Sequence, residues 1–257
     1  MVGKINLNDS RYQYNYKGFC SIINQVIDIA SLHNKIHGDF NVIVEDPQIL
    51  NLFNNLNNPI GETYEVGVLF LEKFFNGQID NSFNAHTIPS YDSLKTKNNV
   101  LNKILKIKPE ILEIFDEEFR LLFNNEEYLG IQLRGTDKKN EIKETPYGKI
   151  IEGIDAALNE TNLKKIFLAT DDIKYVNLIK TKYGNDMVII NESNVFSFDS
   201  KPIHFTNDRN KSNLDVLKDV YYLKNSSYLC YTYSNVGYLA MIMGFNKIKG
   251  FKILNNI

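Results

Sequence analysis

Three short segments of this 257-residue chain place charged and hydrogen-bonding side chains directly after apolar runs. They are Arg134–Lys139 after the run Leu129–Leu133, Thr170–Asp172 after Ile166–Ala169, and Tyr233–Asn235 after Tyr228–Thr232. Ligands of open parallel sheets bind outside the carboxyl ends of the strands. If the runs are parallel strands, we expect the three segments to line one crevice.

The first segment offers groups that suit a phosphate. Arg134 is one of only four arginines among 29 basic residues, and its rigid fork can bind a phosphate through two parallel hydrogen bonds. Gly135 would let the backbone approach a ligand, and Lys138 adds a second positive charge. The structural alternative is an ion pair of Arg134 with Asp137 or Asp171, and we weigh it equally because structural ion pairs are common.

The other two segments admit both structural and functional roles. Asp171 and Asp172 can cap the following helix and complement its dipole, or one of them can accept hydrogen bonds from a ribose, a base edge or a sugar hydroxyl. Tyr233–Asn235 before Val236 is an N-cap pattern, and the helix N-terminus would suit a pyrophosphate. Asp219 falls within a predicted helix, where an acidic side chain is usually solvated.

The elements around these segments alternate between strands and helices. Two further strands are expected at Met187–Ile190 and Ile248–Phe251, and helices are expected at Lys149–Asn159, Ile173–Tyr183, Leu214–Lys224 and Val236–Met243. Short apolar strands separated by helices imply βαβ units, and therefore a parallel sheet with helices on both faces. The second half is thus predicted to be Rossmann-like.

The first half is less regular. Its predicted elements are a loop at Gly18–Cys20, a helix at Ser21–Ile36, strands at Phe40–Val44 and Val66–Leu71, a loop at Asn76–Asn99, and an amphipathic helix from Pro109 to Asn124–Asn125. The end of that last helix is the expected boundary between two domains, residues 1–126 and 127–257.

Composition and missing motifs argue against several classes of protein. A net charge of −2 argues against nucleic acid as a partner. The chain has no GxGxxG and no GxxxxGK[ST], which disfavours dinucleotide oxidoreductases and P-loop NTPases. Its two cysteines and four histidines lack the spacing of a metal site, and no apolar run is typical of a signal peptide or a spanning helix. We expect a cytoplasmic protein with no metal and no membrane-spanning segment.

In order and approximate spacing, these segments resemble the three peptide motifs of the α-1,6-fucosyltransferases. The matching stretches are Ile131–Lys138, Phe167–Asp172, Val216–Asp219 and Tyr231–Ser234, and the loop Lys17–Ser21 is similar to the family's N-terminal glycine loop. The resemblance implies an α/β fold of the GT-B type, with two Rossmann-like domains facing across a cleft. Residues 1–126 would form the acceptor-side domain and residues 127–257 the nucleotide-sugar-binding domain.

The resemblance also implies an activity in glycan biosynthesis. The chain would be an inverting glycosyltransferase that moves L-fucose from GDP-fucose onto a hydroxyl of a glycan or glycolipid, without a metal or other cofactor. Arg134 and Lys138 would help GDP to leave, and Glu141 would be the general base, with Asp137 or Glu144 as alternatives. The implied donor-binding residues are Gln132, Arg134, Asp137, Lys138, Asp171, Asp172, Asp219, Ser234 and Asn235, with Gly18 and Phe19 in the N-terminal loop.

The chain departs from the family pattern at three positions. Gln132 stands where the family has histidine, Gly135 stands where the α-1,6 group has a second arginine, and the family's catalytic glutamate aligns near Ile142. Two alternatives therefore stay open. One is a related transferase that uses GDP-mannose or a dTDP- or UDP-sugar, and the other is a catalytically inert module that binds a nucleotide sugar or a glycan.

Overall fold

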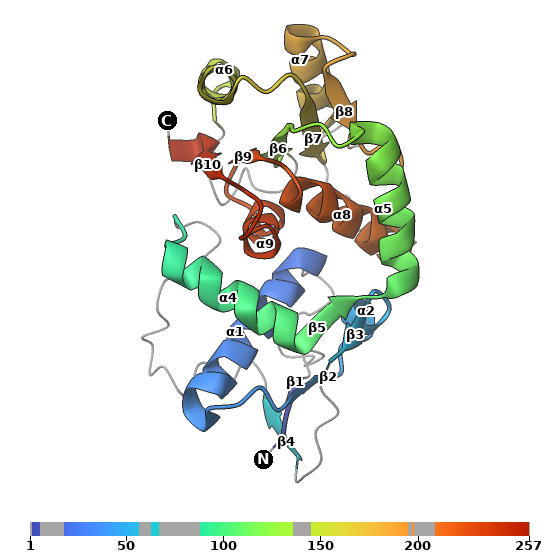
Figure 1. Ribbon diagram of the computed structural model, residues 1–257, viewed down its shortest axis with the longest axis vertical. Helices are drawn as coiled ribbons and strands as arrows, with labels where there is room; N and C mark the ends of the chain where they lie inside the picture. Colours follow the sequence, from blue (N-terminus) through green and yellow to red (C-terminus); the bar gives the residue numbers. More distant parts are fainter. Residues whose placement is uncertain are drawn as a thin grey trace. The chain divides into compact units, whose positions relative to one another are not determined.

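The computed structural model describes residues 2–5, 18–56, 63–66, 88–135, 145–194, 197 and 209–256 (Figure 1). The chain divides into two compact units, residues 1–113 and 114–257. The division falls inside helix α5 (Pro109–Phe123) rather than after residue 126. The reason is that the later part of α5 packs on the second unit, where the ring of Phe115 lies 5.5 Å from that of Tyr221.

The first unit contains a three-stranded parallel sheet in the order β2-β1-β4, and a two-stranded antiparallel sheet formed by β3 and β5. The strands are β1 (Val2–Ile5), β2 (Val42–Val44), β3 (Phe53–Asn55), β4 (Thr63–Val66) and β5 (Leu105–Ile107). The helices are α1 (Phe19–His37), α2 (Pro47–Leu50) and α4 (Tyr91–Ile104). The predicted strand at Val66–Leu71 overlaps β4 only at Val66, and residues 67–71 lie outside the described residues.

Helix α4 corrects the predicted loop at 76–99, of which residues 76–87 lie outside the described part of the chain. Ser90 caps this helix by accepting a hydrogen bond from the Ser93 N–H at 3.2 Å. A buried ion pair joins α4 to α1, with the Lys97 Nζ 2.6 Å from the Asp28 Oδ1. Burial raises the pKa of the Asp28 carboxyl to about 6, while the charge and hydrogen bond of Lys97 act to lower it. The many Asn and Lys residues of this stretch concealed its helical spacing.

The second unit is built on a five-stranded parallel sheet in the order β10-β9-β6-β7-β8. Its strands are β6 (Leu129–Leu133), β7 (Ile166–Thr170), β8 (Val188–Ile190), β9 (Tyr228–Tyr231) and β10 (Gly250–Ile253). Its other elements are the end of α5, helices α6 (Tyr147–Thr161), α7 (Ile173–Tyr183), α8 (Arg209–Lys224) and α9 (Asn235–Met243), and the 3-10 turn η6 (Leu254–Asn256). The prediction of a parallel α/β sheet is confirmed.

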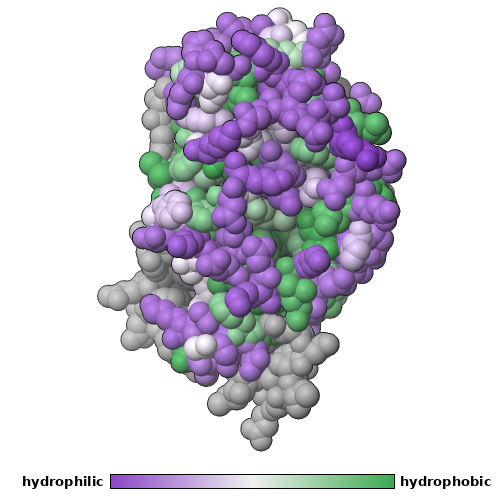
Figure 2. All heavy atoms as spheres, viewed as in Figure 1, coloured by the Kyte–Doolittle hydropathy of each residue, from purple (hydrophilic) through white to green (hydrophobic). Residues whose placement is uncertain are grey.

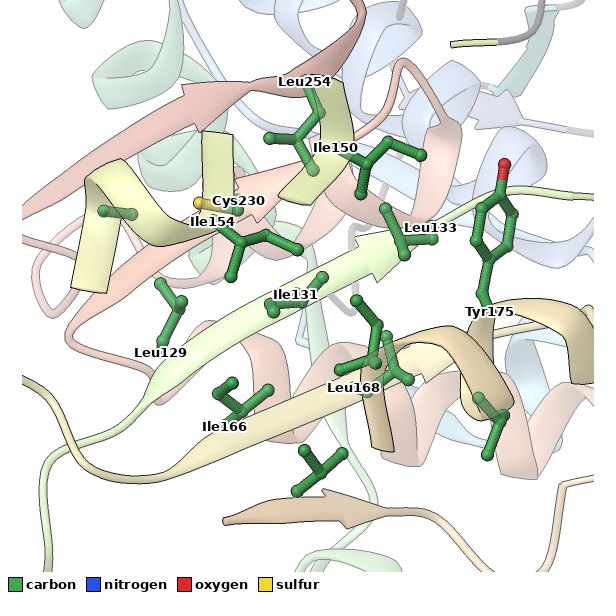
Figure 3. Packing of buried hydrophobic residues seen from close by; sticks show 14 of the residues in the cluster. Leu129, Ile131, Leu133, Ile150, Ile154, Ile166, Leu168, Tyr175, Cys230 and Leu254 are labelled. Carbon is green, nitrogen blue, oxygen red and sulfur yellow. The ribbon is translucent and has the colours of Figure 1, made fainter. Parts of the chain in front are cut away.

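Helices cover both faces of this sheet. On one face, α6 and α7 bury aliphatic side chains such as Ile154 against Ile131 and Leu168 (Figure 3). On the other face, α5 and α8 bury aromatic rings, with Phe123 stacked on Tyr128 at 4.0 Å. The strands are therefore close-packed between an aliphatic layer on one face and an aromatic layer on the other. This packing fixes the carboxyl ends of the strands and the side chains that follow them.

None of the described helices is long and apolar enough to cross a membrane. On the face drawn in Figure 2, hydrophilic residues predominate and apolar residues form smaller groups.

Candidate functional site

The described parts of the three polar segments, Arg134–Gly135, Thr170–Asp172 and Tyr233–Asn235, meet at one edge of the five-stranded sheet. Strand β6 lies between β7 and β9 and is parallel to both, so their carboxyl ends are neighbours. Leu133 is paired with Thr170, and Gln132 is paired with Tyr231. The expectation that these strand ends share one edge is confirmed.

Arg134 and Asp171 form an ion pair at this edge. The Arg134 Nε lies 3.2 Å from the Asp171 Oδ2, and each side chain is 15% exposed. The Asp171 Oδ1 also accepts a hydrogen bond from the Gly135 N–H at 2.8 Å. One carboxylate therefore fixes both the side chain of Arg134 and the backbone after it. This ion pair is one of the alternatives weighed from the sequence.

Thr232, the residue after β9, holds the backbone of Arg134. The Arg134 N–H donates to the Thr232 Oγ1 at 2.9 Å, and the Thr232 N–H donates to the Gln132 carbonyl at 2.9 Å. Thr232 is buried, at 4% exposure. Thr232 lies in the matching stretch Tyr231–Ser234 but was not among the predicted site residues, and the signal that could have found it is a hydroxyl side chain at a strand end.

Ser234 caps helix α9, within the segment Tyr233–Asn235 where the sequence predicts an N-cap. Its Oγ accepts from the Gly237 N–H at 3.0 Å and donates to the Gln132 Oε1 at 2.7 Å. Ser234 and Gln132 are both buried. The hydroxyl hydrogen of Ser234 is thus directed at Gln132, and what this segment presents to an anion is the N-terminus of α9, which begins at Asn235.

Asp172 has the structural role that its position after a strand suggested. Its Oδ1 accepts from the Lys174 N–H at 2.9 Å, which makes it the N-cap of α7, and it is 3% exposed. A Cβ at Gly135 would lie 2.4 Å from the Cβ of Asp172. Gly135 is therefore needed for close packing on Asp172, and the second arginine of the α-1,6 group would not fit here without a shift of Asp172.

Gly135→Ala is expected to destabilise the protein by about 1–3 kcal/mol, since the new methyl group must displace Asp172. It should also lengthen the hydrogen bond between the Gly135 N–H and Asp171. Urea unfolding measures the first effect. Gly148→Ala is the control, because a Cβ at Gly148 meets nothing within 4 Å. Equal stability of the two variants would contradict the packing argument.

Asp219 lies in a separate buried cluster beside strand β8. Its Oδ1 accepts from the Asn191 Nδ2 at 3.1 Å, and its Oδ2 accepts from the Asn194 Nδ2 at 2.8 Å. Burial raises the pKa of Asp219 from 3.8 to about 7, although the two amide hydrogen bonds act to lower it. These contacts tie Asp219 to the residues after β8, not to Arg134 and Asp171.

The raised pKa of Asp219 gives stability a specific pH dependence. The native state holds this proton more tightly than the unfolded state, so the free energy of unfolding falls as the pH rises from 3.8 to about 7. Asp219→Asn does not titrate and should lack this decline. Urea unfolding of both proteins between pH values of about 4 and 8 measures the difference. Parallel curves for the two proteins would contradict the assignment.

The remaining predicted site residues either lie outside the described part of the chain or belong to the first unit. Asp137, Lys138, Glu141 and Glu144 lie outside the described residues. In the first unit, the predicted loop at Gly18–Cys20 is wrong for Phe19 and Cys20, which begin α1, while Gly18 is the N-cap residue of that helix. Phe19 is buried with its ring 6.4 Å from that of Phe53. Among the described residues, no group of three or more His, Cys, Asp or Glu side chains is arranged to hold a metal ion.

Comparisons with known proteins place this arrangement in a known fold. No family model and no curated protein matches the sequence. The α-1,6-fucosyltransferase NodZ soaked with GDP-fucose matches with a TM-score of 0.56 and 12% identity, over 94% of this chain and 92% of that chain. The chain has the fold of this fucosyltransferase. The selenomethionine form from Bradyrhizobium matches with a TM-score of 0.55 and 12% identity, over 96% of this chain and 92% of that chain.

A third NodZ structure, co-crystallised with GDP, matches with a TM-score of 0.53 and 12% identity, over 93% of this chain and 91% of that chain. Likeness at this level of identity establishes the fold. The predicted α/β fold of the GT-B type is confirmed.

Proposed function

We propose that this chain is a glycosyltransferase that transfers L-fucose from GDP-fucose to a hydroxyl group of a glycan or glycolipid, with inversion and without a metal. The observation that carries the proposal is the placement of Arg134. It is clamped by Asp171 at the edge of the sheet where the capped N-terminus of α9 also lies. The fold supports the choice of donor, because NodZ, which shares it, was studied with GDP-fucose and with GDP.

The proposed chemistry is a single displacement. The acceptor oxygen forms a bond to the anomeric carbon, the bond from that carbon to the diphosphate oxygen breaks, and GDP leaves with the electron pair. Arg134 and the N-terminus of α9 would stabilise the charge that grows on the diphosphate, since preorganised donors at a partly buried site act strongly on such charge. Lys138 would add to this stabilisation.

The hydroxyl proton of the acceptor must pass to a base as the new bond forms. Glu141 is our choice, with Asp137 as the alternative. Arg134, Lys138 and the N-terminus of α9 would together stabilise the negative charge of the departing GDP, so a divalent cation would not be needed for that task.

The contacts at the site assign different tasks to its other residues. Asp171 would orient Arg134, because its Oδ2 pairs with the Arg134 Nε and its Oδ1 accepts from the Gly135 N–H. Gln132 would support the cap of α9 through Ser234. The carboxamide of Gln132 does not titrate, so Gln132 would accept the Ser234 hydrogen bond equally at acidic and neutral pH. The histidine that the α-1,6-fucosyltransferases have at this position would change its charge over that range.

Release of GDP from donor sugars tests the proposal. Wild-type protein incubated with GDP-fucose should release GDP by slow transfer to water, faster than from GDP-mannose and equally with and without EDTA. Release of UDP or dTDP from other donors instead would favour a transferase with a different donor. Tight binding of GDP without any release from GDP-fucose, even with glycan acceptors present, would favour the inert binding module.

A further inference from the structure

The pairing of strands β6 and β9 ends in an unusual way. The last backbone hydrogen bond between them runs from the Thr232 N–H to the Gln132 carbonyl, at 2.9 Å. In a parallel ladder the next bond would run from the Arg134 N–H to the carbonyl of Thr232. Here the Arg134 N–H donates instead to the side-chain Oγ1 of Thr232, at 2.9 Å.

This exchange lets two requirements be met together. The chain can turn away after Thr232, the residue that follows β9, and reach Ser234 at the N-cap of α9. Arg134 still keeps a hydrogen bond to this part of the chain through the Thr232 side chain. Thr232 is 4% exposed, so its oxygen offers this bond in a buried setting where a lost partner is costly. Arg134 is then fixed through its backbone on one side and through Nε to Asp171 on the other.

We propose that Thr232 is a positioning residue of the donor site, whose hydroxyl aims Arg134 at the diphosphate. The proposal rests on the proposed function. Threonine suits this task because its branched side chain restricts χ1, which holds Oγ1 in one direction. Thr232 would not touch the nucleotide sugar and would act only through Arg134.

Two variants separate the hydroxyl from the shape of the side chain. Thr232→Val keeps the shape but removes the acceptor, and Thr232→Ser keeps the acceptor. We expect Thr232→Val to weaken GDP binding by roughly tenfold, because small misplacements of a binding group have large effects. Thr232→Ser should stay within about threefold of the wild type. Calorimetry with GDP measures both, and Thr232→Ala serves in place of the valine variant if that protein does not fold.

A matched control uses the same substitution elsewhere in the unit. Thr161 is partly buried near the end of α6, and its hydroxyl is also bonded to the backbone, with its Oγ1 donating to the Ala157 carbonyl at 2.7 Å. Thr161→Val should bind GDP as the wild type does. A similar loss of GDP binding in both valine variants would mean that Thr232 has only a general structural role, and would overturn the proposal.

Amide hydrogen exchange gives a readout that does not depend on GDP. The Arg134 amide should exchange slowly in the wild type and in Thr232→Ser, and faster in Thr232→Val. Fast exchange with unchanged GDP affinity would overturn the positioning role while leaving the proposed function intact. Absence of GDP binding by the wild type would instead overturn the proposed function itself, and the positioning role with it.

Discussion

Arg134→Ala is expected to weaken GDP binding by on the order of 100-fold, the loss that follows from removing a bidentate, charge-assisted contact worth about 3 kcal/mol. The side chain is held at 15% exposure with Nε on Asp171, so little freedom has to be lost when it binds a phosphate. Calorimetry of the wild type and the variant measures the change. Release of GDP from GDP-fucose should disappear with it.

Arg120→Ala is the matched control for this experiment. Arg120 is exposed on α5, and its removal takes away the same charge and the same number of donors. It should leave GDP affinity unchanged. If Arg134→Ala binds GDP within about threefold of the wild type, or if the two variants behave alike, Arg134 does not hold the diphosphate.

Phe123→Ala is expected to have the largest effect on stability, a loss of about 3–5 kcal/mol. Phe123 is fully buried where α5 meets the sheet, stacked on Tyr128 at 4.0 Å and edge-on to Phe167 at 6.1 Å. Truncation removes these ring contacts and leaves a cavity that rigid aromatic neighbours fill poorly. Urea unfolding followed by circular dichroism measures the loss.

Leu121→Ala on the same helix is the control. Leu121 is 75% exposed, so its truncation should change the free energy of unfolding by less than about 0.5 kcal/mol. Similar losses in the two variants would contradict the packing of α5 on the second unit.

The sheet of the second unit could be predicted from local pattern alone. Runs such as Leu129–Leu133 and Ile166–Ala169 are short, apolar and bounded by polar residues, and they coincide with β6 and β7 to within one residue. Parallel strands bring their carboxyl ends to one edge, so the meeting of Arg134 with Asp171 followed from topology. The helix after Ser234 followed from its capping residue.

Features that depend on contacts between distant residues could not be predicted in this way. Gln132 and Ser234 are 102 positions apart in the sequence, so the hydrogen bond that joins them is not visible in any local pattern. Gly135 was interpreted as room for a ligand, but the space beside it is occupied by Asp172. Asp219 was assigned to the donor site by resemblance, and its contacts are with Asn191 and Asn194. The packing of rings on α5 against α8, which places most of α5 in the second unit, likewise depends on residues far apart in the sequence.

The most direct test of the proposed function is calorimetry of the purified wild-type chain with GDP, UDP and dTDP, without added metal and again with EDTA. We predict selective binding of GDP, with the same affinity in both conditions. Selective binding of UDP or dTDP would contradict GDP-fucose as the donor, a requirement for metal would contradict the metal-free site, and no binding to any nucleotide would contradict a nucleotide-sugar site at the edge of this sheet.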